Sequence, residues 1–265
     1  MKFINKKLGY PLILLLPLLF ILPGIARASV FTENFESCSI GNADWPGCDG
    51  WVLGSGSSGY FDTVSSPVHS GSVSGAVDTQ GAGGLNGYVY HSISTLSGSN
   101  YTFSGYFNVG SGHAAYTEIT LNDGSQVACG IGVGGDGHVA LVSPSVTGTT
   151  TVIYIVASGD ADGAWHSFSV YLDNTHSRCT GSVDGGTVSS SLLQGASTTV
   201  SSIRASMYGC TGGGCGSFTP IRFDDLSIDT GTGGGSFDAS THIISFTPIA
   251  STTPITSPTT LGHSD

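Results

Sequence analysis

The carboxylate side chains are the first candidates for chemistry in this chain, because a carboxylate can act as an acid, a base or a metal ligand. Among 18 acidic residues there are only three glutamates: Glu33, Glu36 and Glu118. Glycoside hydrolysis uses two carboxyl groups, about 5–5.5 Å apart for retention or about 6.5–9.5 Å apart for inversion. No glutamate lies in an E-x-D-x-x-E strand pattern, and Asp160 and Asp162 flank a turn. The pattern therefore favours loop acids over a catalytic pair.

The serines and histidines do not form a catalytic or zinc-binding pattern either. No G-x-S-x-G turn marks a nucleophilic serine. His166 follows Trp165 in an alternating run, and we interpret the pair as a packing feature with Trp165 in the core. The other histidines lack the spacing of metal ligands, and we expect most of them at the surface or in loops: His69, His91, His113, His138 and His176. We predict no catalytic residues and a protein that is not an enzyme.

The six cysteines all follow residue 28, and we expect them to form disulfides. An even number in an exported chain is typical of a disulfide framework. Sequence proximity favours Cys38 with Cys48 and Cys210 with Cys215, which leaves Cys129 with Cys179. Six cysteines allow other connectivities as well. No C-x-x-C motif occurs, which disfavours zinc.

The elements that position these residues are predicted to be strands. The chain has 41 glycines, and no sustained helical period occurs beyond the first residues. Period-two or β-branched runs, separated by Gly, Asn and Asp turns, recur at 30–35, 75–78, 87–93, 101–109, 116–121, 126–133, 138–142, 149–156, 166–173, 179–183, 200–208 and 220–228. About a dozen short strands predict an all-β, two-sheet antiparallel β-sandwich (jelly roll) over residues 29–229.

The N-terminal residues 1–28 are predicted to be a secretory signal peptide. Three lysines precede an apolar run over 8–25, and Ala26-Arg27-Ala28 forms a small-x-small cleavage site before Ser29. The alternative is an uncleaved anchor, but three prolines interrupt the run, and a spanning helix needs about 20 apolar residues. No other segment is apolar enough to cross a membrane. We therefore expect a secreted, extracellular or cell-surface protein without a membrane span.

Cleavage would leave a strongly acidic chain. Only three arginines follow residue 28, against 18 acidic residues, so the formal charge becomes 3 − 18 = −15. Such a surface repels phosphate backbones, which makes nucleic acid an unsuitable partner. It attracts divalent cations, although plain solubility explains the excess equally well.

The composition changes at residue 230, where a Gly-rich linker begins, and residues 251–262 are rich in Ser, Thr and Pro. Between them, residues 242–249 are predicted to form a strand with no partner nearby. Residues 230–265 are therefore expected to be a stalk or the start of a truncated second domain.

Three separated segments resemble the laminin-G-like and concanavalin A-like jelly rolls. One is the run D-G-A-W-H from Asp162, followed by V-D-G from Val183. The second is the opening, with E-N-F-E from Glu33, G-W from Gly50, and S-S-P-V-H-S-G-S over 65–72. The third is I-R-F-D-D-L-S-I over 221–228. The last two are similar to MAM-type adhesive domains, and the third also to many carbohydrate-binding modules. Together the matches cover about 200 residues in the right order.

The resemblance implies a structural calcium ion where the first and last strands meet. Carried over to this chain, its carboxylate ligands would be Glu36 and Asp225, with Asp224 as a substitute. Carbonyls near Ser70 and Gly71 would complete the shell. Calcium takes 6–8 oxygen ligands at about 2.3–2.6 Å, which suits this set. The alternative is that the two aspartates merely end a strand, but one of them must point inward and needs a partner.

A glycan-binding surface would need aromatic faces beside polar side chains, because sugar C–H faces stack on rings while hydroxyls need hydrogen bonds. Tyr88 and Tyr90 alternate on one predicted strand face. The full set of candidates is Trp45, Trp51, Tyr60, Tyr88, Tyr90 and Tyr116, although most aromatic residues of such a sandwich belong to its core.

Three classes of function follow from these observations. The leading one is a binding or adhesion module for an extracellular glycan or protein. The others are a carbohydrate-active enzyme or its accessory domain, and a structural surface protein.

Overall fold

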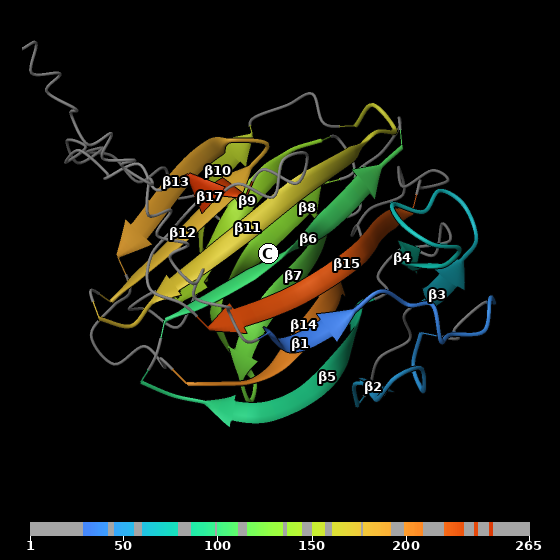
Figure 1. Cartoon of the computed structure of the whole chain (residues 1–265), viewed down its shortest axis with the longest axis horizontal. Coiled ribbons are helices and arrows are strands. Elements are labelled where there is room, and N and C mark those ends of the chain that lie inside the picture. The colour runs from blue at the N-terminus through green and yellow to red at the C-terminus, as the bar shows by residue number, and fades with distance from the viewer. Residues whose placement is uncertain are drawn as a thin grey trace, which may run out of the picture.

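The computed structural model describes residues 29–41, 45–55, 60–78, 86–98, 100–110, 116–134, 137–144, 150–156, 161–175, 177–191, 199–208, 220–230, 236–237 and 244–245. These residues form strands and turns, and two antiparallel sheets lie face to face (Figure 1). The predicted all-β sandwich is confirmed. The predicted signal peptide and most of the predicted tail lie outside the described residues. Within the described part, no helix is long and apolar enough to span a bilayer.

The eight-stranded sheet lies nearer the viewer in Figure 1. Its order is β13-β12-β11-β6-β15-β4-β3, and β1 pairs with β15. The strands are β1 (Ser29–Glu33), β3 (Tyr60–Val64), β4 (Ser74–Asp78), β6 (Tyr101–Val109), β11 (Trp165–Asp173), β12 (Arg178–Val183), β13 (Gly186–Ser191) and β15 (Ile221–Thr230).

The seven-stranded sheet lies behind it, with the order β10-β9-β8-β7-β14-β5-β2. Its strands are β2 (Trp51–Leu53), β5 (Asn86–Leu96), β7 (Tyr116–Asp123), β8 (Gln126–Gly134), β9 (Val139–Pro144), β10 (Thr150–Val156) and β14 (Val200–Tyr208). A separate pair consists of β16 (Ser236–Phe237) and β17 (Ile244–Ser245). The prediction that the strand near residue 244 lacks a partner was therefore wrong, because Ile244 pairs with Phe237.

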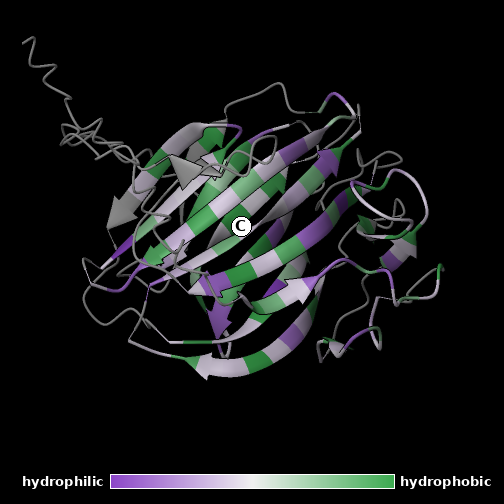
Figure 2. Cartoon of the chain, in the orientation of Figure 1, coloured by the Kyte–Doolittle hydropathy of each residue, from purple (hydrophilic) through white to green (hydrophobic). Residues whose placement is uncertain are grey.

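Alternation along the strands builds the core between the two sheets. Figure 2 shows hydrophobic and hydrophilic residues alternating along the strands of the eight-stranded sheet. Phe103 and Phe107 of β6 face Ile119 and Leu121 of β7 in one cluster of buried side chains, and all four are fully buried. Complete burial of each such side chain contributes about 1.5–3 kcal/mol. This apolar layer holds the sheets together.

Two disulfides confirm two of the predicted pairs. Cys129 of β8 bonds to Cys179 of β12, so this bond joins the two sheets through the core. Cys38 bonds to Cys48 near the N-terminal end of the sandwich. The third predicted pair, Cys210 with Cys215, lies outside the described residues.

β15 changes its partner at a bulge. Along one edge it pairs with β6 on both sides of the bulge, with a register shift between Asp224 and Ser227. On the other edge Phe223 pairs with Gly75 of β4 while Leu226 pairs with Glu33 of β1. Asp225 lies at the change, with φ of 49° in the left-handed region. The first and last strands of the sandwich meet here, as the resemblance implied.

Three strands of the sandwich, and the two-residue β16 outside it, were absent from the sequence prediction. β2 has only three residues and β13 reads G-T-V-S-S-S, so neither carries a clear apolar alternation. β3 was overlooked although its sequence, Y-F-D-T-V, is a plausible strand. Elsewhere the predicted and observed bounds differ by a few residues at most.

The D-G-A-W-H…V-D-G run is a β-hairpin whose ends are tied together by His166. The Nδ1 atom of His166 lies 2.6 Å from Asp184 Oδ2, and its Nε2 atom lies 3.2 Å from Asp162 Oδ1. Asp184 also accepts the backbone N–H of Ser167 at 2.9 Å. The His166 ring stacks with Phe107, but the prediction that Trp165 lies in the core was wrong. Trp165 pairs with Asn108 on the outward row of the eight-stranded sheet and is half-buried there, beside His69.

Candidate functional site

The outer face of the seven-stranded sheet carries an unusual group of polar and aromatic side chains. Three adjacent strands, β5, β14 and β7, supply them, because alternate residues of each strand point away from the core. Ser206 pairs with Tyr88 on one side and with Glu118 on the other, and Tyr208 pairs with Tyr116. We call this group the tyrosine strip, and it consists of Tyr88, Tyr90, Tyr116, Glu118, Arg204, Ser206 and Tyr208.

Glycines lie under both ends of the tyrosine strip. A Cβ atom on Gly132 of β8 would lie 1.8 Å from the Tyr116 hydroxyl, and one on Gly54 would lie 2.1 Å from Tyr88 Cζ. Both separations are far shorter than a van der Waals contact. Each tyrosine ring therefore lies against the backbone of a glycine, Tyr116 on Gly132 and Tyr88 on Gly54. Because glycine has no side chain, the ring can occupy that space.

Arg204 lies at the middle of the tyrosine strip. Its Cζ atom is 3.7 Å from the centre of the Tyr88 ring, and its Nε donates to Ser206 Oγ at 2.8 Å. A guanidinium over an aromatic face is attracted by about 0.5–2 kcal/mol. These two contacts fix the plane of the guanidinium on the sheet.

Glu118 is the buried acid of the tyrosine strip, with 6% of its surface exposed. The Tyr208 hydroxyl donates to its Oε2 at 3.0 Å. Burial raises the pKa of Glu118, although Tyr208, Arg204 and Tyr116 each act to lower it. Burial and the neighbouring Glu118 carboxylate raise the pKa of Tyr208 to about 12. Tyr208 therefore stays a hydrogen-bond donor at any ordinary pH.

The arrangement can bind a polar ring compound. It combines aromatic rings with hydroxyl, guanidinium and carboxyl groups, which are the partners that sugar C–H faces and hydroxyls need. Within the described part of this face, Glu118 is the only carboxyl group of the tyrosine strip, whereas glycoside hydrolysis uses two. Glu33 and Glu36 lie in and beside β1, in the other sheet.

Three of the predicted ligand residues come together in the tyrosine strip: Tyr88, Tyr90 and Tyr116. Trp45 and Trp51 do not join them, and their selection as ligand residues was wrong. Trp45 is 0% and Trp51 1% exposed, and their rings pack edge to face in the core with centroids 5.2 Å apart. The side chain of Tyr60 lies outside the described residues.

Sequence reasoning missed Arg204, Glu118 and Tyr208. The strand over 200–208 was predicted, and its alternation already placed Arg204 and Tyr208 on one face. The sequence did not show that β14 lies between β5 and β7, because neither neighbour is adjacent to it along the chain.

The predicted calcium ligands lie around the loop that connects β3 to β4 (residues 65–73). This loop contacts β15 at Asp224 and Asp225, between the parts that pair with β4 and with β1. Glu36 Oε1 accepts the backbone N–H groups of Ser72 at 2.7 Å and Val73 at 2.9 Å. These hydrogen bonds lower the pKa of Glu36. A Cβ atom on Gly71, whose φ is 62°, would lie 2.2 Å from Glu36 Oε1, so only glycine allows this close approach.

The two adjacent aspartates hold the same loop from β15. Asp224 is fully buried, and its Oδ2 accepts the N–H groups of His69 at 2.9 Å and Ser70 at 3.2 Å. Burial raises its pKa despite these bonds. Asp225 accepts from Ser70 Oγ at 2.7 Å and lies 2.7 Å from His69 Nδ1. The expected inward carboxylate is Asp224, and its partners are loop amides.

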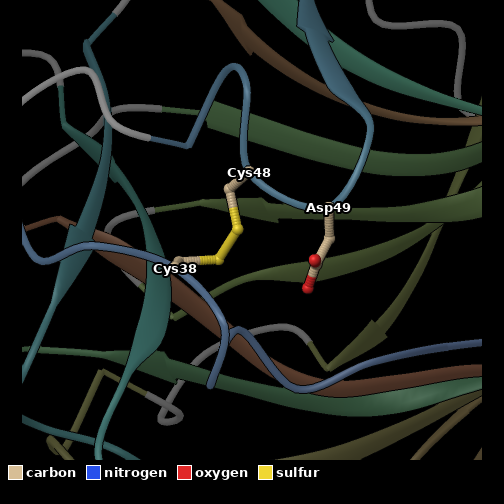
Figure 3. A group of neighbouring side chains, drawn as sticks. All are labelled: Cys38, Cys48 and Asp49. Atoms are coloured by element: carbon tan, nitrogen blue, oxygen red, sulfur yellow. A yellow bond between two sulfur atoms is a disulfide. The ribbon is translucent and has the colours of Figure 1, made fainter.

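Carboxylates and a serine hydroxyl are oxygen donors of the kind that calcium needs, so the chemistry of this set fits the ion. Among the described residues, a single group has three His, Cys, Asp or Glu ligand atoms within 4.8 Å of one another. This group is Cys38, Cys48 and Asp49. Figure 3 shows that its two sulfur atoms are bonded to each other, which leaves no thiolate for a metal. Calcium binding stays a prediction.

No protein-family model matches the chain. No curated protein sequence matches it either. Solved structures do resemble it. An endo-β-1,4-glucuronan lyase from the fungus Trichoderma reesei is 12% identical over 77% of this chain and 96% of its own, with a TM-score of 0.55.

Two further structures come from bacteriophages. The CBM2 module of the evolved Dit of Lactobacillus casei BL23 phage J-1 is 14% identical over 77% of this chain and 95% of its own, with a TM-score of 0.52. A carbohydrate esterase from Shiga toxin-encoding bacteriophage phi24B is 14% identical over 78% and 100%, with a TM-score of 0.52. At these identities the likeness establishes the jelly-roll fold.

Proposed function

We propose that this protein is an extracellular glycan-binding module that holds a sugar chain on the tyrosine strip. The observation that carries the proposal is that Tyr88, Arg204, Tyr208 and Tyr116 come from three adjacent strands and share one sheet face. An extracellular place is supported by the two disulfides, since such bonds persist in oxidising compartments.

The extent of the tyrosine strip across the strands favours an oligosaccharide over a single sugar. Neighbouring strands lie about 4.8 Å apart, so the four strands from β5 to β8 span about 14 Å. Tyr88 leans beyond β5 over Gly54 and carries Arg204 on its ring, and Tyr116 leans over Gly132 of β8, so a tyrosine lies at each end. A chain of sugars lying across the strands would contact both tyrosines, with Arg204 and Tyr208 between them.

The test is a glycan array followed by calorimetry on the best ligand. Tyr88→Ala and Tyr116→Ala are each expected to weaken binding by about 2- to 13-fold, because an aromatic contact contributes about 0.5–1.5 kcal/mol. Tyr171→Ala is the matched control, since Tyr171 lies on the outer row of the eight-stranded sheet. Loss of binding in the control alone, or no glycan bound by the folded protein, would contradict the proposal. Release of new reducing ends from a bound polysaccharide would show an enzyme instead.

We also propose a structural calcium ion at the loop that connects β3 to β4 (residues 65–73), held by Glu36, Asp225 and Asp224 with the carbonyls of Ser70 and Gly71. The ion would offset the repulsion among three carboxylates and hold the loop to the first and last strands. A chelator is then expected to lower the melting temperature by several degrees, and added calcium to restore it. Asp225→Asn should show a smaller response. An identical melting curve with and without chelator rules the ion out.

A further inference from the structure

We propose that Arg204 makes the tyrosine strip selective for glycans that carry an anionic group, a carboxylate or a sulfate. This inference rests on the proposed function. It assigns the class of sugar, which the aromatic contacts leave open because ring stacking does not depend on the charge of the sugar.

Positive side chains are scarce in this protein. Beyond residue 28 the chain has no lysine and three arginines. Arg178 is exposed at the start of β12, and Arg222 donates to Asn108 Oδ1 at 3.4 Å and to the carbonyl of Pro220 at 3.2 Å. The third, Arg204, lies in the middle of the candidate binding face. Among the described residues, no other cation contributes to the tyrosine strip.

The guanidinium of Arg204 is positioned but not neutralised by an ion pair. Tyr88 holds its plane and Ser206 binds its Nε, and neither contact supplies a negative charge. Among the described residues Arg204 forms no salt bridge and its terminal nitrogens make no hydrogen bond. A guanidinium presents its N–H groups as a rigid fork that matches the two oxygens of a carboxylate or sulfate. The fixed fork is the feature that points to an anion.

Glu118 is the internal carboxyl that could satisfy Arg204, and the structure directs it elsewhere. Its Oε2 accepts from Tyr208, and it forms no salt bridge with Arg204. Arg204 does favour its ionised form, yet burial outweighs this effect and raises the pKa of Glu118. Tyr208, with its pKa raised to about 12 by burial and the Glu118 carboxylate, adds no negative charge. The geometry therefore leaves Arg204 without an ion-pair partner among the described residues.

The charge of the whole chain makes this inference easy to test. With three arginines against 18 acidic residues, the surface repels anionic polymers at long range. Any preference for a charged glycan must therefore come from a local contact and not from general attraction. A protein without such a contact should prefer the neutral form of the same sugar chain.

The experiment uses an array of neutral, uronate-containing and sulfated glycans, and then matched pairs made from the best ligand. A uronate chain is compared with its carboxyl-reduced form, and a sulfated chain with its desulfated form. The wild-type protein is expected to bind the charged form about 10- to 100-fold more tightly, since a hydrogen bond to a charged group contributes about 1.5–3 kcal/mol. The pair that shows the preference identifies which anion is recognised.

Variants separate the charge from the fold and from the rings. Arg204→Gln should bring the ratio of the affinities for the charged and neutral forms to about one or below, whatever it does to the neutral form, and Arg204→Lys should keep part of that ratio. Tyr116→Ala should weaken both forms by the same factor. Thermal melting checks that each variant folds, and Arg204→Lys serves if Arg204→Gln does not.

The outcomes also separate this inference from the proposed function. If the folded protein binds glycans but binds neutral forms equally or better, the inference is wrong and the proposed function stands. The inference also fails if the preference survives in Arg204→Gln. If no glycan of any class binds, the proposed function itself is wrong.

Discussion

Replacement of Gly132 by alanine tests whether the position of a ring, and not merely its presence, determines binding. The new Cβ atom would lie 1.8 Å from the Tyr116 hydroxyl and 2.3 Å from its Cζ. Ordinary contact begins near 3.4 Å, so the hydroxyl must move by about 1.6 Å (3.4 − 1.8). The φ angle of Gly132 is not in the left-handed region, so the backbone accepts alanine and the strain falls on the tyrosine.

The displaced ring is expected to lose most of its contact with a bound sugar. An aromatic contact contributes about 0.5–1.5 kcal/mol, which corresponds to about 2- to 13-fold weaker binding. Titration calorimetry with the best glycan measures the change. In a Tyr116→Ala background the ring is absent, so adding Gly132→Ala should change the affinity no further.

That double-mutant cycle provides the refutation. If Gly132→Ala weakens binding by the same factor with and without the Tyr116 ring, the glycine acts through the sheet and not through the tyrosine. Gly54→Ala offers the corresponding test at the other end, where Tyr88 Cζ lies 2.1 Å from the added Cβ position.

Three further predictions concern stability. Replacing Cys129 and Cys179 by serine should lower the free energy of unfolding by about 2–4 kcal/mol, because the bond closes a loop with a sequence separation of 50; an unchanged urea midpoint would contradict this. Glu118→Gln should stabilise the protein at neutral pH and lose this advantage in acid. Burial raises the pKa of Glu118, so the wild-type protein loses stability as pH rises through that pKa, whereas glutamine does not ionise. Parallel plots of stability against pH for the two proteins would contradict this prediction. His166→Asn should lower the melting temperature, because His166 stabilises two ionised carboxylates. The pKa of Asp162 is lowered by a backbone hydrogen bond from Ala164 and by His166. His166 also helps to lower the pKa of Asp184, although burial alone would raise it. That difference should shrink as pH falls below about 4, the pKa of aspartate in the unfolded chain, and be lost as pH passes the lower pKa values of the folded state; a difference that is constant with pH would contradict this role of His166.

The fold could be predicted from the sequence wherever alternation ran over many residues. Strands such as 101–109 and 200–208 were predicted with their observed bounds, because one face of each had to be apolar to cover a core. β2 and β13 were missed because short or Ser-rich edge strands bury little surface and so carry little pattern. Cysteine spacing favoured the two disulfides that the structure contains, without excluding other pairings.

The candidate site divides in the same way. The sequence by itself determined that Tyr88 and Tyr90 share one face of a strand, since that follows from the period of two. It could not separate the core tryptophans Trp45 and Trp51 from surface aromatics, because both kinds look alike in a Gly-rich chain. Only the tertiary structure decided that Arg204 lies beside Tyr88, since the pairing of β14 with β5 joins residues more than a hundred positions apart. Sheet order depends on packing across the whole core, and no local pattern encodes it.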